Sequence, residues 1–477
     1  MIKKQLSDKT IVEAYPLTQA QRLMYFVFNS YGKNPAVLNI GTGCYWQGEF
    51  DGALLKEALY EAADRCESMK LRFSPDQQFG LVQYLADKHC ITVEEFDHSN
   101  MTEDESFAIL KEWTRQGIDF IEKPLNTIRI MHLPNGYNGF YTKFHHLAFD
   151  GYAAKMFIAD TMAIYLHKKT GSAYPKPLRS YIEAMKQELA YLESEQRTAD
   201  RAYWMNTFTS STEPVFNDYL IDNRLKKERL ESGDANRRYV LMHDGDHPES
   251  RTLHYDVSAE DSAKIRNMCR ERGLSVPCVL MLGLRTALSI FNERQNDVSF
   301  KFMINRRGTL LEKKSGGNRW HFFTLRTIVP EEQTFAEAAL NVETEQNEVF
   351  AHCSFDTLEM YHIKHMAMKM DKLEQTYDTM SFSYHAPLEI PFETPEIKAT
   401  AKGVWYNNDY SAQNLYLTVK HRLSDDGFEF IFEYRINENP LEDLKVFYDK
   451  LIKVLLVGAE NPDIKIGEIL DILKLDD

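Results

Sequence analysis

Residues 128–151 read IRIMHLPNGYNGFYTKFHHLAFDG and carry most of the information about the fold. Alternating residues predict one strand over 128–133 and a second over 139–145. The segment between them contains Pro, Asn and Gly, whose turn chemistry makes the two strands a hairpin. After Asp150-Gly151 the pattern becomes helical from Tyr152 to about His167. A hairpin that runs directly into a helix predicts a mixed α/β fold.

The C-terminal half repeats this mixture of elements. LYLTVKHRL (415–423) and FEFIFEYRI (428–436) alternate apolar and polar residues and are joined by Asp-Asp-Gly, which predicts a second hairpin before an amphipathic helix over 441–457. Residues 176–250 are rich in charge and poor in strands, and within them we expect NRLKKERLESGDANRR to be a solvated loop. The predicted organisation is an N-terminal subdomain over 1–175, a helical bridge over 176–250 and a C-terminal subdomain over 251–477.

Composition excludes several classes of protein. The chain has 477 residues, of which 43% are hydrophobic and 27% charged, with a net charge of -15, so a basic nucleic-acid-binding surface is not expected. No apolar run is long enough for a membrane span, and the first residues lack the apolar core of a secretory signal. The six cysteines are scattered singly, which is typical of free thiols in a cytoplasmic protein.

The heptapeptide at 145–151 carries the strongest chemical signal. If the strand persists to its end, His145 and His146 point to opposite faces, so only one of them enters a given cavity. An imidazole suits general base work because its unperturbed pKa is near 6.5. Asp150 is either a carboxylate that pairs with a buried arginine or a helix N-cap. Gly151 permits a tight turn and a close approach of its N–H to a substrate.

The heptapeptide HHLAFDG resembles the HHxxxDG signature of condensation domains of nonribosomal peptide synthetases, which are part of the chloramphenicol acetyltransferase-like superfamily. The resemblance extends to YPLTQAQRLMYF (15–26), to RCESMKLRF (65–73), to RAYWMNTF (201–208) and to the C-terminal stretch 438–469. It implies two acetyltransferase-like α/β sandwich subdomains in a V-shape, with the active-site tunnel between them and a floor loop and latch in the C-terminal subdomain.

The sequence departs from the family's pattern near this implied channel. Where the family usually reads G-x-F-V-N-T-x-x-x-R, residues 317–326 read GNRWHFFTLR, so Arg319 and His321 replace an aromatic residue and an Asn on either side of Trp320. Tyr152 stands where a Trp is common, and Asn305-Arg306 precede the altered loop. The resemblance places these positions in the channel or its support, so they bear on the choice of substrate more than on the chemistry.

The resemblance also implies a mechanism without a cofactor bound by the chain itself. The acyl donor arrives as a thioester on the phosphopantetheine arm of a carrier protein, and a small amine or alcohol is the acceptor. His146, beside His145, orients or deprotonates the acceptor, and the Gly151 N–H stabilises the oxyanion. Asp150 is bonded to an arginine, for which Arg306 is the first candidate and Arg22 and Arg72 are alternatives.

Other interpretations stay open beside this one. An acyl-CoA-dependent acyltransferase of the same superfamily would use the same His, and a non-catalytic recruitment module would need that His displaced. His352, His362 and His365 do not predict a metal site, because no acidic or Cys ligand accompanies them; His243 and His247 are expected to be loop residues. The chain begins with Met1 and ends after its last motif, so we expect a free-standing enzyme. Donor, acceptor, amide or ester product and oligomeric state are not specified.

Overall fold

The computed structural model describes residues 2–31, 34–242, 247–370, 374–386, 393–394, 397–398, 402–422 and 424–474. His243 lies outside the described residues. The chain divides into two units: unit 1 comprises Met1–Ser194, Asn305–His321 and Glu389–Tyr410, and unit 2 comprises Glu195–Ile304, Phe322–Leu388 and Ser411–Asp477. Each unit contains a sheet with helices, as expected for the α/β fold class.

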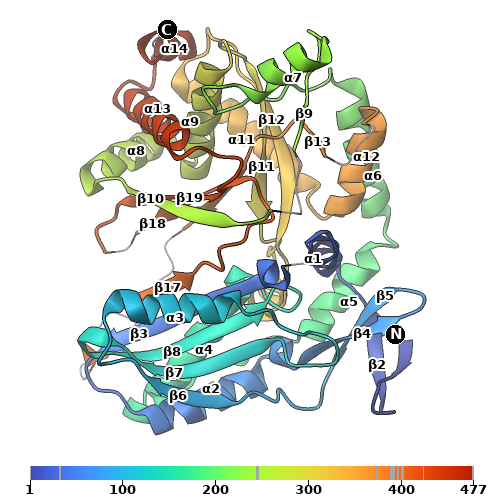
Figure 1. Ribbon diagram of the computed structural model, residues 1–477, viewed down its shortest axis with the longest axis vertical. Helices are drawn as coiled ribbons and strands as arrows, with labels where there is room; N and C mark the ends of the chain where they lie inside the picture. The colour runs from blue at the N-terminus through green and yellow to red at the C-terminus, as the bar shows by residue number, and fades with distance from the viewer. Residues whose placement is uncertain are drawn as a thin grey trace. The chain divides into compact units, whose positions relative to one another are not determined.

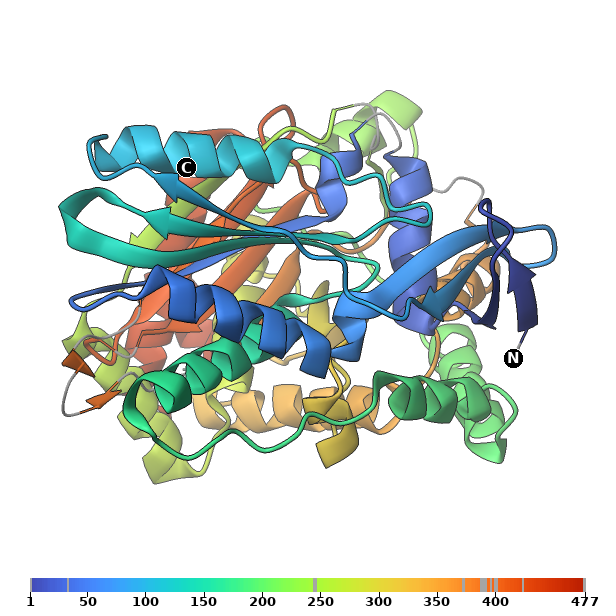
Figure 2. The ribbon, with the colours of Figure 1, turned by 90° about the horizontal axis from the view of Figure 1, so that it is seen from below.

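The main sheet of unit 1 has the strand order β17-β3-β8-β7-β6. Strands β6 and β7 are parallel, and the other neighbours are antiparallel. Figure 2 shows this sheet nearly edge-on, with helix α3 on one face and helices α2 and α4 on the other. A smaller antiparallel sheet of order β1-β2-β5-β4 belongs to the same unit.

The elements of unit 1 have the following bounds: β1 Ile2–Gln5, β2 Ile11–Pro16, α1 Gln19–Ser30, β3 Asn39–Gln47, α2 Gly52–Arg65, β4 Leu71–Asp76, β5 Gly80–Leu85, β6 Val93–Asp97, α3 Glu103–Arg115, β7 Asn126–His132, β8 Tyr137–His145, α4 Gly151–Thr170, α5 Tyr181–Tyr191, α10 Leu310–Lys314, β15 Glu393–Thr394, β16 Ile397–Lys398 and β17 Lys402–Tyr406.

The predicted N-terminal hairpin is confirmed. Strands β7 and β8 pair antiparallel with Ile128 opposite Thr142 and His132 opposite Asn138. The connecting turn uses Asn135 and Gly136 with φ of 60° and 72°, the left-handed backbone that these two residue types tolerate best. The hairpin delivers His145 to the end of β8, directly before α4.

The sheet of unit 2 has the order β10-β19-β18-β14-β11-β12 and includes the second predicted hairpin, β18–β19. Helices α8, α9, α11, α13 and α14 contribute to one continuous hydrophobic core with the inward residues of this sheet. Helix α9 is buried along nearly its whole length, and Figure 1 shows α13 and α8 near it. The indole of Trp204 on α6 stacks on Phe323, with ring centroids 5.5 Å apart.

The elements of unit 2 have the following bounds: α6 Glu195–Ser210, α7 Arg224–Ser232, β9 Val240–Leu241, β10 Ser250–Asp256, α8 Ala259–Arg272, α9 Val276–Phe291, β11 Asp297–Ile304, β12 His321–Ile328, α11 Phe335–Ala351, α12 Thr357–Ala367, β13 Gln375–Thr376, β14 Ser381–His385, β18 Leu415–His421, β19 Phe428–Arg435, α13 Leu441–Glu460 and α14 Ile466–Ile472.

Two findings differ from the expected organisation. The charged stretch that we predicted as a loop contains helix α7, because the Asn223 side chain caps its N-terminus and Gly233 ends it with a left-handed φ of 67°. The expected division also assigned all residues after 251 to one subdomain, whereas 305–321 and 389–410 group with the N-terminal residues in unit 1. Strand β17, for example, pairs with β3 across more than 350 positions of sequence.

No single helix in the described part of the chain is both long and apolar enough to cross a membrane. Among the helices described, α8 and α9 are long and apolar enough when taken as a pair, but they are bent by 115° at their junction.

Candidate active site

His145 is a buried, neutral residue. Its Nδ1 accepts a hydrogen bond from the Leu147 N–H at 3.2 Å, which leaves the proton on Nε2. Its ring lies 5.2 Å from that of Phe120, measured between centroids, and its side chain is inaccessible to solvent. Desolvation lowers the pKa of His145 to about 3, and proximity to His146 contributes to the shift. His145 is therefore placed to support the turn rather than to exchange protons.

His146 follows β8 and is partly exposed. Its main chain is fixed on both sides: the N–H donates to the Leu38 carbonyl at 2.8 Å, and the carbonyl accepts from Asn318 Nδ2 at 2.6 Å. The centroid of its ring lies 6.1 Å from that of the Trp320 ring. Desolvation lowers the pKa of His146 to about 4, although Asp150 and the Phe149 main chain oppose the shift. The imidazole is thus neutral at pH 7 and able to accept a proton or a hydrogen bond.

Asp150 combines the two roles that the sequence left open. Its Oδ1 accepts from the Ala153 N–H at 2.8 Å and so caps helix α4. Both carboxylate oxygens also bind one guanidinium, that of Arg307, at 2.7 and 3.0 Å, and the Arg319 N–H adds a bond to Oδ2 at 2.9 Å. The side chains of the ion pair are 1% and 3% exposed, so the pair is buried.

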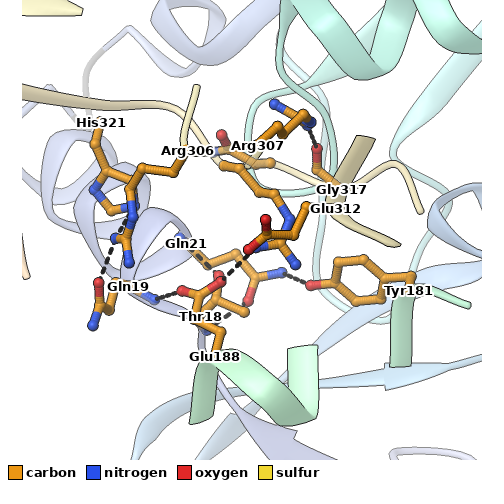
Figure 3. A network of polar contacts seen from close by, with 12 residues as sticks. Thr18, Gln19, Gln21, Tyr181, Glu188, Arg306, Arg307, Glu312, Gly317 and His321 are labelled. Carbon is orange, nitrogen blue, oxygen red and sulfur yellow. Dashed lines mark hydrogen bonds and ion pairs between the residues drawn. The ribbon is translucent and has the colours of Figure 1, made fainter. Parts of the chain in front are cut away.

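The prediction that Arg306 is the partner of Asp150 is wrong. Arg306 has a left-handed φ of 43°, and its Nη1 instead donates to the side chain of Gln19 and to His321 Nε2 (Figure 3). Arg72 bonds main-chain carbonyls, among them that of His89 at 2.8 Å. Arg306 and Arg307 point in different directions, and it is Arg307 that faces Asp150.

The other expected support residues group around the same loop. His321 is buried, and its pKa is lowered well below the usual range by desolvation and then by the positive charges of Arg306, Arg319 and Arg22. Arg22 is exposed on helix α1. Arg319 lies near Glu188, with Nη1 3.5 Å from a carboxylate oxygen. Figure 3 shows how helix α1, helix α5 and the loop at 305–321 contribute to this network.

Asn305 and Tyr152 hold Arg307 in place. The Asn305 carbonyl accepts from Arg307 Nη1 at 3.2 Å, and its Oδ1 accepts from the Arg307 N–H at 3.3 Å. The Tyr152 ring lies under the guanidinium, with Arg307 Cζ 4.6 Å from the ring centroid. The Gly317 carbonyl completes the set by accepting from Nη2 at 2.8 Å. The structure therefore places Asn305 and Tyr152 as support of the Asp150 ion pair.

Helix α4 starts at Gly151 and presents free donors. In the part of the chain that the structure describes, no acceptor is bonded to the N–H groups of Gly151 and Tyr152. These two groups lie at the positive end of a 20-residue helix dipole. N–H groups of this kind are donors that can stabilise an oxyanion, and they follow His146 by five and six positions in the sequence.

Sequence reasoning missed Arg307 and Asn318. Arg307 bears the ion pair, and Asn318 fixes the carbonyl of His146. The pair of consecutive arginines at 306–307 was a signal for Arg307, because neighbouring residues in an irregular loop point in different directions. Nothing in the sequence around Asn318 indicates its role, since only the folded loop brings it close to His146.

No cluster of His, Cys, Asp and Glu that could hold a metal ion occurs among the residues described. His352 is engaged elsewhere, with Nδ1 2.9 Å from Asp200 and its ring stacked on Tyr203. All six cysteines are free thiols; four are buried, Cys353 is half-buried and Cys90 is exposed.

Comparison with known proteins decides the family. A model of the condensation domain matches residues 11–473. The chain belongs to the condensation domain family. Condensation domains form an amide bond by acyl transfer in nonribosomal peptide biosynthesis and act on substrates carried by carrier proteins. The expected family and enzyme class are thereby confirmed.

This condensation domain resembles parts of much larger proteins. It is 23% identical over 466 residues to surfactin synthase subunit 1 of Bacillus subtilis (strain 168), covering 95% of the chain and 12% of the relative. It is 23% identical over 475 residues to the dimodular nonribosomal peptide synthase of the same organism, covering 97% of the chain and 19% of the relative. The chain thus spans about a fifth or less of these two relatives.

Solved structures support the fold. The first condensation domain of the calcium-dependent antibiotic synthetase, in complex with a substrate analogue, matches with a TM-score of 0.76 at 17% identity, covering 96% of the condensation domain and 99% of that chain. The starter condensation domain of rhizomide synthetase in complex with C8-CoA matches with a TM-score of 0.76 at 16% identity, covering 95% and 96% of the two chains.

Proposed function

We propose that this condensation domain transfers an acyl or aminoacyl group from the phosphopantetheine thioester of a carrier protein to an amine, with His146 beside the attacking nitrogen. The amine lone pair attacks the thioester carbonyl carbon, and the carbonyl oxygen takes up negative charge. The carbon–sulfur bond then breaks, and the thiolate leaves on the carrier. The proton lost by nitrogen passes by way of His146 to the sulfur, so atoms and charge balance. A hydroxyl acceptor would give an ester by the same steps.

The observation that carries this proposal is a neutral, partly exposed imidazole fixed beside the start of helix α4. The pKa of His146 is lowered to about 4, so the ring is unprotonated at pH 7. Its Nδ1 is buried and has no partner at hydrogen-bond geometry among the described residues, so we assign the substrate contact to Nε2. The free N–H groups of Gly151 and Tyr152 would receive the oxyanion.

The low basicity of His146 affects its expected contribution. A neutral amine attacks a thioester without full deprotonation, so holding the amine in line can supply a large part of the acceleration. His146 would accept a hydrogen bond from the amine and take its proton as the tetrahedral intermediate forms. We assign Asp150 a structural role, because its oxygens are occupied by Arg307, Ala153 and Arg319.

A direct test uses a carrier protein loaded with an acyl group and an amine acceptor, and follows the carrier's intact mass and the product. We expect turnover by the parent and a loss of about 10²–10⁴-fold in His146→Ala, with an unchanged circular dichroism spectrum. His132→Ala is the matched control, because His132 lies in the same hairpin but bonds Glu95 and Asn138 instead. Equal turnover by His146→Ala and the parent would remove His146 from the chemistry.

A second arm of the same experiment tests the source of the donor. The starter condensation domain of rhizomide synthetase was solved in complex with C8-CoA, so a CoA thioester is a concrete alternative. We expect octanoyl-CoA to be a poorer donor than the octanoyl carrier by at least tenfold in kcat/KM. Equal efficiency of the two donors would replace our donor assignment with the acyl-CoA-dependent acyltransferase.

A further inference from the structure

Trp405 is a large apolar side chain that the fold leaves 47% exposed beside the start of helix α4. A Cβ built on Gly151 would lie 3.8 and 3.9 Å from two atoms of the six-membered ring of this indole. No other atom of the described residues lies within 4 Å of that position, apart from the neighbouring residues and the backbone of the helix itself. The side-chain position of Gly151 is therefore open space with one aromatic boundary.

The indole is held by a strand with little freedom to move. Trp405 pairs with Thr42 of β3, and Thr42 Oγ1 donates to the Val404 carbonyl at 2.9 Å. The next residue, Tyr406, is buried on the other face of the sheet, where its hydroxyl donates to that of Tyr45 at 3.0 Å. Asn408 Nδ2 then donates to the Ala36 carbonyl at 2.7 Å. Anchors on both sides of Trp405 fix the main chain from which its ring reaches the position beside Gly151.

Two tryptophans thus flank the proposed reacting centre within unit 1. The Trp320 ring lies next to His146, and the Trp405 ring lies next to Gly151. If the thioester oxygen is held by the N–H of Gly151, the atoms bonded to the carbonyl carbon lie within a few ångströms of this position. An indole at that distance restricts the size of the groups that those atoms can carry.

We propose that Trp405 is a specificity-determining residue that limits the bulk of the donor next to the reacting carbonyl. The preferred substrate class is an acyl thioester that is unbranched, or carries only a small substituent, at the carbon attached to the carbonyl. The inference rests on the proposed function and refines it by naming the donor class. A methyl group in a hydrophobic pocket is worth about 10–200-fold in discrimination, and a site bounded by one indole corresponds to the low end of this range, which is still measurable.

The test compares two isomeric thioesters, butanoyl and 2-methylpropanoyl, on the same carrier with one amine acceptor. We expect the parent to prefer the unbranched donor in kcat/KM and Trp405→Ala to shift that ratio at least tenfold toward the branched one. Gly151→Ala keeps the N–H but fills the same space, so it should shift the ratio the opposite way. Trp405→Phe retains an aromatic ring and should fall between the parent and Trp405→Ala.

Phe107→Ala is the matched control, since Phe107 is 44% exposed and packs on Tyr406, with ring centroids 5.3 Å apart. It loosens the same strand from the opposite face without touching Gly151. A ratio that stays within twofold in Trp405→Ala, or an equal shift in Phe107→Ala, would overturn the inference.

A binding measurement separates this inference from the proposed function. A non-reactive thioether analogue of each acylated carrier is titrated while tryptophan fluorescence is recorded. We expect Trp405→Ala to gain affinity for the branched analogue relative to the unbranched one, whether or not the parent turns over. An unchanged affinity ratio would contradict the role of Trp405, whereas a parent that binds both analogues but forms no product would contradict only the proposed reaction.

Discussion

Removal of the Asp150 carboxylate should destabilise unit 1, which contains both residues of the buried ion pair. In Asp150→Ala, the Arg307 guanidinium stays buried, and in place of a carboxylate it keeps the carbonyls of Gly317 and Asn305 and the ring of Tyr152. Breaking a buried pair in this way costs about 3–5 kcal/mol. The lost cap on the Ala153 N–H adds about 1 kcal/mol. We therefore expect a total loss of roughly 4–6 kcal/mol, equivalent to a fall in melting temperature of about 10 °C or more.

The opposite change, Arg307→Met, should cost less. Asp150 would keep the N–H groups of Ala153 and Arg319 and the dipole of α4 as compensation. The double variant Asp150→Ala/Arg307→Met removes both charges and should be no less stable than Asp150→Ala alone. The coupling energy from this double-mutant cycle should be about 2 kcal/mol or more.

Thermal unfolding followed by tryptophan fluorescence suits this test. Trp46, Trp113, Trp320 and Trp405 belong to unit 1, and Trp204 belongs to unit 2, so the signal reports chiefly on the unit that is changed. Lys123→Met is the control, because its partner is Asp119 on the surface and exposed pairs are worth less than about 1 kcal/mol. If Asp150→Ala melts within a degree of the parent, or the double variant is much less stable than both single ones, the buried ion pair does not stabilise this loop.

Two further predictions concern buried groups near the site. The folded pKa of His145 is about 3, below the unfolded value near 6.5, so the unfolded chain binds the proton first as the pH falls. The free energy of unfolding should be constant above about pH 7 and decrease below about pH 6.5 by up to ~1.4 kcal/mol per pH unit. Urea unfolding at pH 7 and pH 5 measures this loss, which should be smaller in His145→Asn than in the parent. Gly317→Ala should be markedly less stable than Gly233→Ala in the same assay, because both glycines have left-handed φ, of 77° and 67°, but only at residue 317 would the Cβ lie 2.4 Å from Tyr181. Similar losses in the two glycine variants would mean that Tyr181 gives way at no cost.

The parts of the fold that could be predicted from the sequence depend on local chemistry. The hairpin at 126–145 was predictable because the turn residues and the strand alternation lie within twenty positions of one another. The start of α4 was predictable for the same reason, since Asp150 caps a helix three residues away. Helix α7 was missed because its charge on all sides looks like a loop, although Asn223 and Gly233 are recognisable caps.

Features that depend on distant segments could not be predicted in this way. The choice of Arg307 over Arg306 follows from a left-handed backbone at Arg306, which residue type alone does not reveal. The pairing of β17 with β3 joins residues 402–406 to residues 41–45, and nothing in either stretch names the other. The tunnel between two halves that the resemblance implies stays a prediction.

The state of His146 leads to a last prediction, about the pH dependence of the reaction. Desolvation outweighs the attraction of Asp150, because that carboxylate is committed to Arg307, and the pKa of His146 lies at about 4. The ring is then neutral across pH 6–9, and protonation of the acceptor amine controls the rate. An aminoacyl acceptor with an amine pKa near 8 should show kcat/KM rising tenfold per pH unit below about pH 8. With an acceptor whose amine pKa is lower, this rise in kcat/KM should move to lower pH by the difference between the two amine pKa values. A limb that stays near pH 6.5 with both acceptors would mean that an ordinary histidine titrates in the reaction and that burial does not set the pKa of His146.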